Sequence, residues 1–470
     1  MEMKLTTLRS EIENNLFRSG YNLASFAKVS GLNRGSLSAI LHGNPPKPVS
    51  LGQLDALTKA FGFPEGWFYT LYVDECFSED KVSRRRVEPF LIRCVETGKQ
   101  QCVDEIINRI MEYPKPLDVV YSVAEKLFAG GKIQEAKAFY KIIVEHEQDS
   151  SSERLAISQY RIFKSLESVM DMEEMLRAVI TFEPFRGRIP DHLQLDGLLK
   201  LANVCFTLHR WSDMERYTDE LRALADGIYR EQLRKKTGRR TEELQLLRPL
   251  VLYYAHGHLM KATALTKQGK YEEAQKFTAM YADLGWFELL DEEGLRIVEA
   301  FRSFAVGNSF TLEMQVGNFA VLPEYTAYMV KQPSEILSGL VSILEAANRF
   351  DYSVDHVLEQ FSAEMAGFEQ LQDRLNIERI YRLGYQLALY YSERRQYTRG
   401  VDYILQCLKA AIQLNSAKDI LECVTLFEET RESAGGHQLL LYRELLKGLR
   451  KHQDLAANRE RRSAMAERSF

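Results

Sequence analysis

A ten-residue segment occurs twice in this chain in nearly the same form. GKIQEAKAFY covers residues 131–140, and GKYEEAQKFT covers residues 269–278. Looser copies begin at Met170, His209 and Arg395, so successive copies start 39, 39, 60 and 126 residues apart. Self-similarity at such a period is typical of an array of stacked supersecondary units. The spacing predicts a unit of about 40 residues, with one insertion in the third step and further units in the last step.

Small residues recur in register with these copies. Each clear copy ends its pattern on a small residue, and a second small residue stands twelve positions before it, in the pairs Ala124 and Ala136, Ala262 and Ala274, and Ala388 and Gly400. Two helices that cross at small side chains explain this spacing. Elsewhere apolar residues recur at three and four positions, and alternating strand-like segments are hard to find. The sequence therefore predicts an all-α fold in which each repeat is a pair of helices.

The composition restricts the class of protein. A chain of 470 residues is longer than one hydrophobic core usually serves, and its net charge of -5 predicts no general affinity for polyanions. The N-terminus carries Lys4, Arg9 and Glu11 and does not read as a signal peptide, and no apolar run approaches membrane-spanning length. Six cysteines lie far apart without a C-x-x-C pair. We expect a cytoplasmic protein with reduced thiols.

The first 73 residues have a different pattern from the repeats. In SFAKVSGLNRGSLSAILHG, residues 25–43, Asn22 can cap a helix to about residue 30, and Gly31 offers the left-handed conformation that a sharp turn needs. Asn33 can cap a second helix that ends at Gly43. The pair cannot bury its apolar faces alone, so amphipathic helices at 5–20 and 50–62 and the segment 64–72 are expected to complete a five-helix unit.

This unit resembles the helix-turn-helix domain of phage-repressor-like regulators. Ala27, Gly31, Leu32, Leu37 and Ile40 fall where that family has its small, turn and buried apolar residues. Leu23 stands where the family often has a glutamine, so that residue's DNA contact is not carried over.

The resemblance implies that the second helix of the motif enters the DNA major groove. The residues expected at the bases are Asn33, Arg34, Gly35, Ser36 and Ser38, and those expected nearer the phosphates are Ser25, Lys28, His42, Asn44 and Lys47. Arg34 is the candidate for a bidentate guanine contact. A solvated helix face is the alternative reading. SRRR, residues 83–86, follows the unit and is a further candidate for phosphate contact. Residues 1–73 carry seven Lys and Arg against five Asp and Glu, and this weak excess implies a dimer.

The repeats resemble tetratricopeptide repeats, in which helix pairs stack into a superhelix. In that family the first helix of each pair lines a concave groove. The resemblance brings nine residues to the groove, namely Tyr121, Tyr160, Lys164, Asp196, Asn203, His256, Thr263, Arg382 and Tyr385, of which Tyr160, Lys164, Asn203, His256, Thr263, Arg382 and Tyr385 are the candidate peptide contacts. For any single one of these residues, a local packing role is the alternative.

A phage-repressor-like head on a tetratricopeptide body resembles the peptide-responsive transcription regulators of Gram-positive bacteria, the group that includes Rgg, PlcR, PrgX and the phage arbitrium receptors. The resemblance implies a homodimer that binds an operator and whose repeat domain binds a short signalling peptide. The alternative is a Rap-like body that binds response regulators or acts on them as a phosphatase, with the head as a DNA tether. A co-chaperone-like scaffold is a third reading, against which the DNA-reading head counts.

The expected organisation is a DNA-binding domain at 1–75, a linker helix region at 76–116, a repeat domain at 117–452 and a tail at 453–470. A dimer contact is expected within about residues 416–450. The chain has no phosphate-binding G-x-x-x-x-G-K-[ST] segment and no nucleophile elbow. His256 and His258 lie two residues apart, which on a helix points them to different faces. We therefore expect no enzyme activity, no catalytic residue, no cofactor and no metal site.

Overall fold

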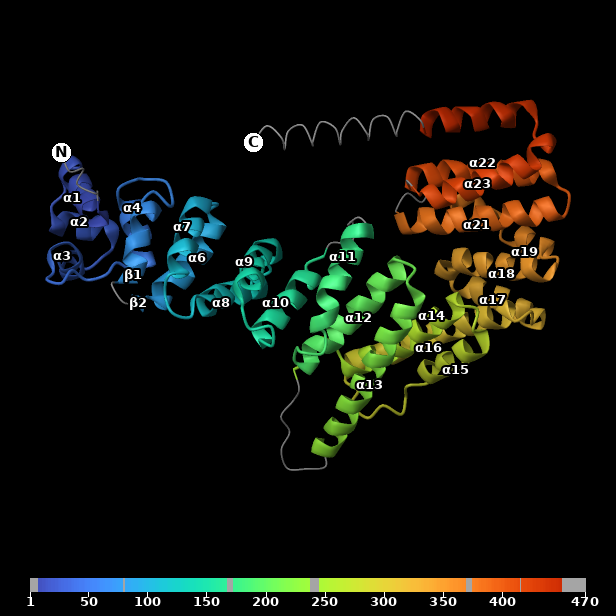
Figure 1. The fold of residues 1–470 in the computed structure, drawn as a ribbon, viewed down its shortest axis with the longest axis horizontal. Helices are drawn as coiled ribbons and strands as arrows, with labels where there is room; N and C mark the ends of the chain where they lie inside the picture. Colours follow the sequence, from blue (N-terminus) through green and yellow to red (C-terminus); the bar gives the residue numbers. More distant parts are fainter. Residues whose placement is uncertain are drawn as a thin grey trace. The chain divides into compact units, whose positions relative to one another are not determined.

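The computed structural model describes residues 7–78, 81–166, 172–236, 245–368, 374–414 and 416–449 (Figure 1). These residues form helices apart from one pair of two-residue antiparallel strands, β1 (Phe77–Ser78) and β2 (Lys81–Val82). The predicted all-α class is therefore confirmed. The chain divides into two compact units, the first Met1–His209 with Leu244–Leu247 and the second Arg210–Glu243 with Arg248–Phe470. The predicted tail at 453–470 lies outside the described residues.

The first unit begins with the expected short helices. They are α1 (Leu8–Arg18), α2 (Leu23–Ser30), α3 (Arg34–His42), α4 (Leu51–Ala60) and α5 (Tyr69–Tyr72), followed by the 3-10 helix η1 (Val73–Cys76). The side chains of Asn22 and Asn33 accept hydrogen bonds from the first turns of α2 and α3, as the sequence predicts. Gly31 between them has a φ of 69°, a conformation that costs glycine little because it has no Cβ.

Helical hairpins follow directly. The remaining elements of the first unit are α6 (Arg84–Glu96), α7 (Gln100–Ile110), α8 (Pro116–Ala129), α9 (Ile133–His146), α10 (Glu153–Lys164), α11 (Met172–Phe182), η2 (Glu183–Phe185) and α12 (Asp191–Thr207). Helix α6 packs against both α7 and α8, so α6 and α7 form a hairpin in series with the next one. One continuous apolar core runs from Leu8 to Ile143. The segment expected to be a linker is thus part of the packed array.

The second unit continues with longer hairpins. Its elements are α13 (Trp211–Lys236), α14 (Leu250–Lys267), α15 (Tyr271–Ala282), α16 (Glu292–Gln315), η3 (Phe319–Val321), α17 (Leu322–Lys331), η4 (Pro333–Glu335), α18 (Ile336–Phe350), α19 (Asp355–Gln360), α20 (Ser362–Phe368), α21 (Arg374–Glu393), α22 (Tyr397–Leu414), α23 (Ala417–Thr430), η5 (Arg431–Ser433) and a last helix at 436–449. Helices α14, α16, α18 and α21 pack in succession, and each of α14, α16 and α21 also packs against the helix that follows it. The unit is therefore a stack of helix pairs.

The repeated segments at residues 131, 269 and 395 coincide with the second helix of a pair. The copies at residues 131, 209, 269 and 395 begin two residues before α9, α13, α15 and α22. The long step between the last two contains α17 and α19, which carry no recognisable copy. The step of 60 residues contains α13, which is 26 residues long. The predicted insertion and hidden units are confirmed.

The small residues make the helix crossings close. Ala124, Ala136, Ala274 and Ala388 are fully buried. A Cβ on Gly400 would lie 2.6 Å from Ser392 Oγ, closer than Cβ atoms approach other atoms in folded proteins, and 3.3 Å from the Ala388 carbonyl oxygen, which is a tight contact. The predicted crossing of α21 and α22 at these small residues is therefore confirmed.

Hydrogen bonds between neighbouring repeats set the length of the unit. Side chains that bond across the stack are separated by 36 residues in the pairs Arg154 and Asp118, Arg161 and Glu125, Tyr160 and Asp196, and Gln438 and Asp402. Asn348 and Gln386 are separated by 38 residues. In these pairs the unit that stacks is 36 to 38 residues long, somewhat shorter than the predicted 40 residues.

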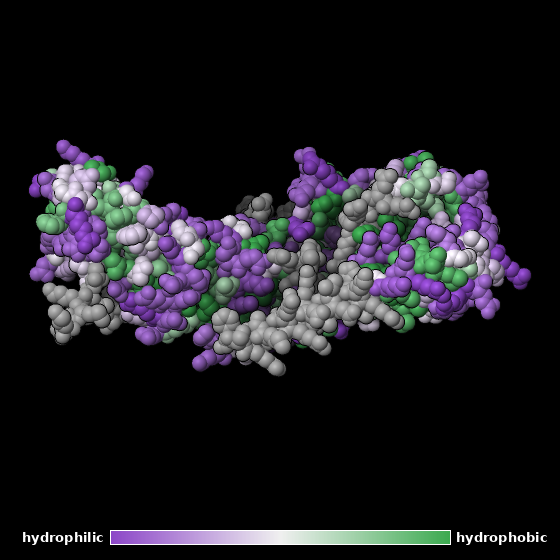
Figure 2. All heavy atoms as spheres, turned by 90° about the horizontal axis from the view of Figure 1, so that it is seen from above, coloured by the Kyte–Doolittle hydropathy of each residue, from purple (hydrophilic) through white to green (hydrophobic). Residues whose placement is uncertain are grey.

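The surface of the array mixes residue types. On the face seen in Figure 2, apolar residues are interspersed with hydrophilic ones. Across the ranges that the structure describes, no helix combines the length and the apolar character needed to cross a bilayer.

Candidate functional site

Helices α2 and α3 form a compact pair with one exposed end. Phe26 of α2 and Leu37 and Ile40 of α3 are buried to 1% exposure or less, which fixes how the two helices cross. Asn33 Oδ1 accepts a hydrogen bond of 2.7 Å from the Gly35 amide. Arg34 is exposed and makes no hydrogen bond or ion pair within the described ranges. The N-terminal turn of α3 therefore presents a free guanidinium beside a glycine.

The other end of α3 is held by a polar cluster. Arg9 of α1 donates from Nε to the Ile40 carbonyl oxygen at 3.0 Å and from Nη2 to the Lys47 carbonyl oxygen at 3.3 Å. The same guanidinium pairs with Glu75, whose Oε2 also accepts from the Val49 amide at 3.2 Å. These bonds connect α1, the C-terminal part of α3 and η1. They therefore fix the orientation of α3 relative to α1 and η1.

The ten candidate DNA contacts fall into two groups. Ser25, Ser36 and Ser38 are half-buried, and Ser25 takes part in the cap of α2. The exposed members are Lys28, Asn33, Arg34, Gly35, His42, Asn44 and Lys47. His42 Nδ1 lies 3.4 Å from Glu13 Oε1 of α1, so a protonated His42 would pair with a carboxylate of the protein. Arg34, Lys28 and Lys47 remain as exposed cations at this end of the first unit.

The arginines at the start of α6 are largely used within the fold. Arg84 donates to Glu88 at 3.1 Å and to the Asp118 carbonyl oxygen at 3.1 Å. Arg86 is half-buried, and its charge counteracts the rise that burial causes in the pKa of the Cys76 thiol, which still reaches about 12. Arg85 is exposed. Arg85 is therefore the arginine of this segment that is most available to a phosphate, and phosphate contact by SRRR stays a prediction.

The candidate groove residues of the first unit form a local cluster. Tyr160 is fully buried, and its hydroxyl donates to Asp196 Oδ2 at 2.8 Å. Lys164 Nζ lies 3.0 Å from the same carboxylate oxygen. Tyr160 therefore lies in the core between α10 and α12, and the prediction that it contacts a peptide is wrong because its whole side chain is covered. Lys164 keeps 30% of its side chain exposed.

Asn203 and Thr263 bond to their own helices. Asn203 Nδ2 donates to the Leu199 carbonyl oxygen at 2.9 Å, and Thr263 Oγ1 donates to the Leu259 carbonyl oxygen at 2.9 Å. Asn203 is exposed, so its amide oxygen and its second N–H are open to a partner. Thr263 is half-buried. Of these two residues, Asn203 is the better placed to bind a ligand.

His256 and His258 lie on α14 among aromatic rings. The His256 ring packs edge-on against Phe301, with centroids 5.0 Å apart, and the His258 ring lies 4.8 Å from that of Tyr254. Burial, with a smaller effect of Arg248 for His256 and of Arg222 for His258, lowers the pKa of each imidazole to about 4. Both side chains are therefore neutral near pH 7. Among the described residues, no three His, Cys, Asp or Glu side chains come together as a metal site would require.

Arg382 and Tyr385 lie on α21 in the second unit. Arg382 pairs with Glu378 at 3.1 Å and remains about one-third exposed, and Tyr385 stacks on Tyr381 with centroids 6.1 Å apart. The structure therefore places the candidate groove residues in two sets. Tyr160, Lys164 and Asn203 belong to the first unit, and His256, Thr263, Arg382 and Tyr385 belong to the second.

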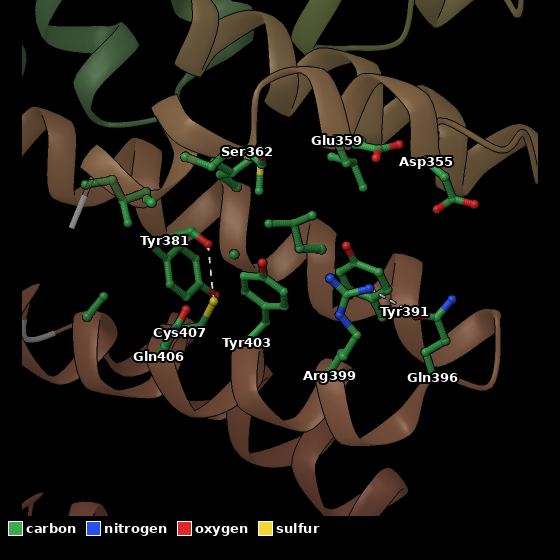
Figure 3. A pocket seen from close by; sticks show the side chains of 18 residues that line it. Asp355, Glu359, Ser362, Tyr381, Tyr391, Gln396, Arg399, Tyr403, Gln406 and Cys407 are labelled. Atoms are coloured by element: carbon green, nitrogen blue, oxygen red, sulfur yellow. Dashed lines mark hydrogen bonds between the residues drawn. The ribbon is translucent and has the colours of Figure 1, made fainter.

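The second unit contains a pocket that no pattern in the sequence predicts. Its volume is about 610 Å³, and helices α19 to α22 line it (Figure 3). Tyr381, Tyr391, Tyr403 and Arg399 contribute to its walls. These residues belong to different helices, and a period measured along the chain carries no signal that they meet.

The chain matches no protein-family model and no curated protein sequence. Among solved structures, it is similar to a circular tandem repeat protein described as having a novel repeat topology and enhanced subunit contact surfaces. The two are 12% identical over 95% of this chain and 90% of that one, with a TM-score of 0.14. Such a score supports no structural argument, so the description as a helical repeat rests on the contacts given above.

Proposed function

We propose that this protein is a sequence-specific DNA-binding transcription regulator whose repeat body binds a short signalling peptide. In this proposal α1 to α5 are a phage-repressor-like helix-turn-helix domain, and the hairpins that follow are a tetratricopeptide-like body. The observation that carries the proposal is the exposed N-terminal turn of α3, where Arg34 has no partner among the described residues. A helix that is buried along one side and presents a free arginine at its N-terminus fits a recognition helix.

The contacts on DNA follow from this orientation. Arg34 reaches a guanine in the major groove, where a bidentate pair contributes about 1 to 3 kcal/mol of discrimination. Gly35 allows the backbone to approach closely, and a Cβ there would meet Asn33 Oδ1 at 3.1 Å. Lys28 and Lys47 contact phosphates and fix the register. The cluster of Arg9 and Glu75 supplies the rigidity that a reading helix needs.

Dimerisation through the C-terminal hairpin completes the binding unit. The weak positive excess of residues 1–73 favours two heads on one operator, with half-sites about 34 Å apart or a multiple of that distance. Helix α23 and the last helix expose Leu421, Leu440 and Leu441, with exposures of 66%, 61% and 37%. Apolar side chains so exposed at the end of a repeat array favour pairing of two chains there. Light scattering tests the assembly, and a monomer at micromolar concentration with and without DNA contradicts it.

The peptide contacts are charges and amides on the first helices of the repeats. In the first unit Lys164 is a partly exposed cation that can pair with a peptide carboxylate, and Asn203 has open amide groups for the peptide backbone. Arg382, in the second unit, is the alternative cation for such a carboxylate. A peptide of about five to ten residues suits such a surface. Peptide binding then changes operator affinity by about 5- to 150-fold, the range for a coupling of about 1 to 3 kcal/mol.

Selection of bound fragments from the genome of the source organism with the purified protein tests DNA binding. Enrichment of one inverted-repeat sequence supports the proposal, and recovery of random fragments contradicts it. Calorimetry with short peptides encoded beside the gene tests the second half. Asn203→Ala should weaken the binding of such a peptide. It should leave the DNA affinity measured without peptide unchanged, since Asn203 lies in the repeat body and not in α1 to α5.

A second candidate function is regulation by binding a protein, as in Rap-like proteins that bind response regulators. Helix α16 favours it, because Leu295, Phe304 and Val306 of this helix expose 59%, 47% and 41% of their area. Apolar exposure on a repeat helix fits a folded partner as well as a peptide. A folded protein that binds through these residues, combined with failure of every short peptide, would favour this second function.

A further inference from the structure

The pocket in the second unit results from an interruption in one helix. In the hairpin that begins with α18, the second helix is split into α19 and α20, which have six and seven residues. In the next hairpin, α22 is continuous over 18 residues. The break lies at Phe361, which is buried to 1% exposure and has non-helical angles of -103° and 18°. Helix α20 therefore leaves the line of α19, and the space between it and α22 remains open over α21.

The floor of the pocket is apolar and tightly packed. Leu358, Leu383 and Leu387 line it and are at most 6% exposed. Gly384 lies between them, and a Cβ there would come within 2.7 Å of Cys407 Sγ. The Cys407 thiol itself donates to the Tyr381 carbonyl oxygen at 3.4 Å. A ligand that enters the pocket thus meets a rigid apolar floor.

The two rims carry opposite charges. Figure 3 shows Asp355, Glu359 and Ser362 along one side and Tyr403, Arg399 and Gln396 along the other. The Arg399 guanidinium lies 4.5 Å above the Tyr391 ring and donates to Gln396 Oε1 at 3.4 Å. Within the described ranges no carboxylate pairs with Arg399. Its charge is therefore available to an anion that enters the pocket.

The acidic rim is similarly open. Asp355 accepts hydrogen bonds from the Tyr390 hydroxyl at 3.1 Å and from Ser353, whereas Glu359 is exposed and makes no hydrogen bond or ion pair within the described ranges. The Tyr391 and Tyr403 rings lie nearly parallel at 9°, with centroids 5.7 Å apart, beside the arginine. An apolar body between a free cation and a free carboxylate suits a ligand that carries both charges at its ends.

We propose that this pocket binds a short apolar peptide of two or three residues with free ends, its carboxylate on Arg399 and its ammonium on Glu359. A pocket of about 610 Å³ is of a size that takes a small ligand such as a dipeptide or tripeptide. The volume lies within the range of about 300 to 1,000 Å³ that is usual for small-ligand sites. The site is separate from the proposed contacts at Arg382 and Asn203, and it does not depend on DNA binding.

Calorimetry on the full chain without DNA tests the site with leucyl-leucine as the probe. One molecule should bind per chain. The N-acetylated dipeptide and the dipeptide amide should each bind at least about tenfold more weakly, since each loses one charge-assisted hydrogen bond. Free leucine should also bind more weakly, because it covers less of the apolar floor; leucine that binds as tightly as the dipeptide overturns the assigned length.

Three variants locate the binding. Arg399→Gln should weaken leucyl-leucine at least about tenfold and leave the affinity for the dipeptide amide unchanged. Ala366→Phe fills the pocket from an exposed position of α20 and should abolish binding of both. Arg395→Gln also removes one arginine charge, but from the turn before α22 and outside the pocket. This variant should bind leucyl-leucine as tightly as the wild type does. Absence of binding, or binding that survives both Arg399→Gln and Ala366→Phe, overturns the proposal.

Discussion

The guanidinium of Arg9 on α1 donates to both carboxylate oxygens of Glu75 on η1, 66 residues later in the chain. The same guanidinium bonds the Ile40 carbonyl at the C-terminal part of α3, and Glu75 accepts from the Val49 amide. Glu75 is only 9% exposed and Arg9 is 24% exposed, so most of the pair is shielded from water. One ion pair thus joins α1, the C-terminal part of α3 and η1.

Loss of this pair should loosen the head. Glu75→Gln leaves Arg9 without a counter-charge and should lower the free energy of unfolding by about 3 kcal/mol, as breaking a buried pair does. Urea unfolding followed by circular dichroism measures the change, and amide exchange in α3 should become faster. In the Arg9→Met background, Glu75→Gln should lower the free energy of unfolding much less than it does in the wild type. Additive effects of the two substitutions would contradict the proposed coupling.

The free arginine of α3 should act on DNA and not on stability. Arg34→Ala should abolish sequence-specific binding and leave the melting temperature nearly unchanged, because an exposed side chain without partners contributes little to folding. Arg18→Ala, on the exposed end of α1, removes the same charge and is the matched control. Fluorescence anisotropy with the selected operator measures both. Equal operator affinity of Arg34→Ala and the wild type would contradict the assignment of α3 as the reader.

The repeat pattern predicted much of the array because its turns are chemically constrained. The pair Gly-Lys at 131 and 269 marks a turn in which Gly131 and Gly269 have φ values of 77° and 76°. The same pair occurs at Gly98, with a φ of 66°, just before α7. That copy is detectable in the sequence, and it extends the repeat pattern back into the segment 76–116 that is predicted to be a linker. Helices α17 and α19 have no Gly-Lys pair before them and could not be found in this way.

The repeat period does not predict which side chains of neighbouring repeats contact one another. The repeat pattern predicts Tyr160 on an exposed face. In the structure its hydroxyl donates a hydrogen bond to Asp196 of the next helix pair, and its ring is buried. The pocket depends on the break at Phe361, and no glycine or proline marks that break in the sequence. A period identifies which residues share a face of one helix. It does not show which side chains of the neighbouring helices cover that face.

The buried histidines of α14 should make stability depend on pH. The pKa of His258 falls from 6.5 to about 4 in the folded protein, chiefly through burial, so the unfolded chain binds a proton that the folded chain does not. The stabilisation is complete above about pH 6.5 and is lost as the pH falls toward 4. In His258→Phe, the loss of unfolding free energy between pH 7 and pH 4 should be about 2 to 3 kcal/mol smaller than in the wild type.

Urea unfolding at several pH values measures this difference. His437→Gln alters an exposed histidine of the last helix and should keep the pH dependence of the wild type. Addition of zinc should not stabilise the wild type if the histidines only pack. An unchanged pH dependence in His258→Phe would contradict the inferred burial of a neutral imidazole.

The turn between α21 and α22 carries a residue that is poorly suited to its conformation. Arg395 has a φ of 60° at the position where two other repeats have Gly131 and Gly269. A left-handed conformation costs a residue with a Cβ about 1 to 2 kcal/mol, and glycine avoids this cost. Glycine loses more conformational entropy on folding, however, and this offsets about 0.5 to 1 kcal/mol of the gain. Arg395→Gly should therefore raise the free energy of unfolding by about 0.5 to 1 kcal/mol.

The reciprocal change provides the control. Gly131→Ala places a Cβ at a φ of 77° with no atom within 4 Å, so only the backbone conformation is penalised, and the substitution should destabilise the protein by about 1 kcal/mol. Amide exchange in the helices flanking each turn, measured with urea unfolding, shows whether the effect is local. Arg395 is exposed and lies outside the pocket of the second unit, so Arg395→Gly should leave dipeptide binding unchanged. If Arg395→Gly destabilises the protein, the arginine contributes a contact that outweighs its backbone strain, and the equivalence of the three turns is wrong.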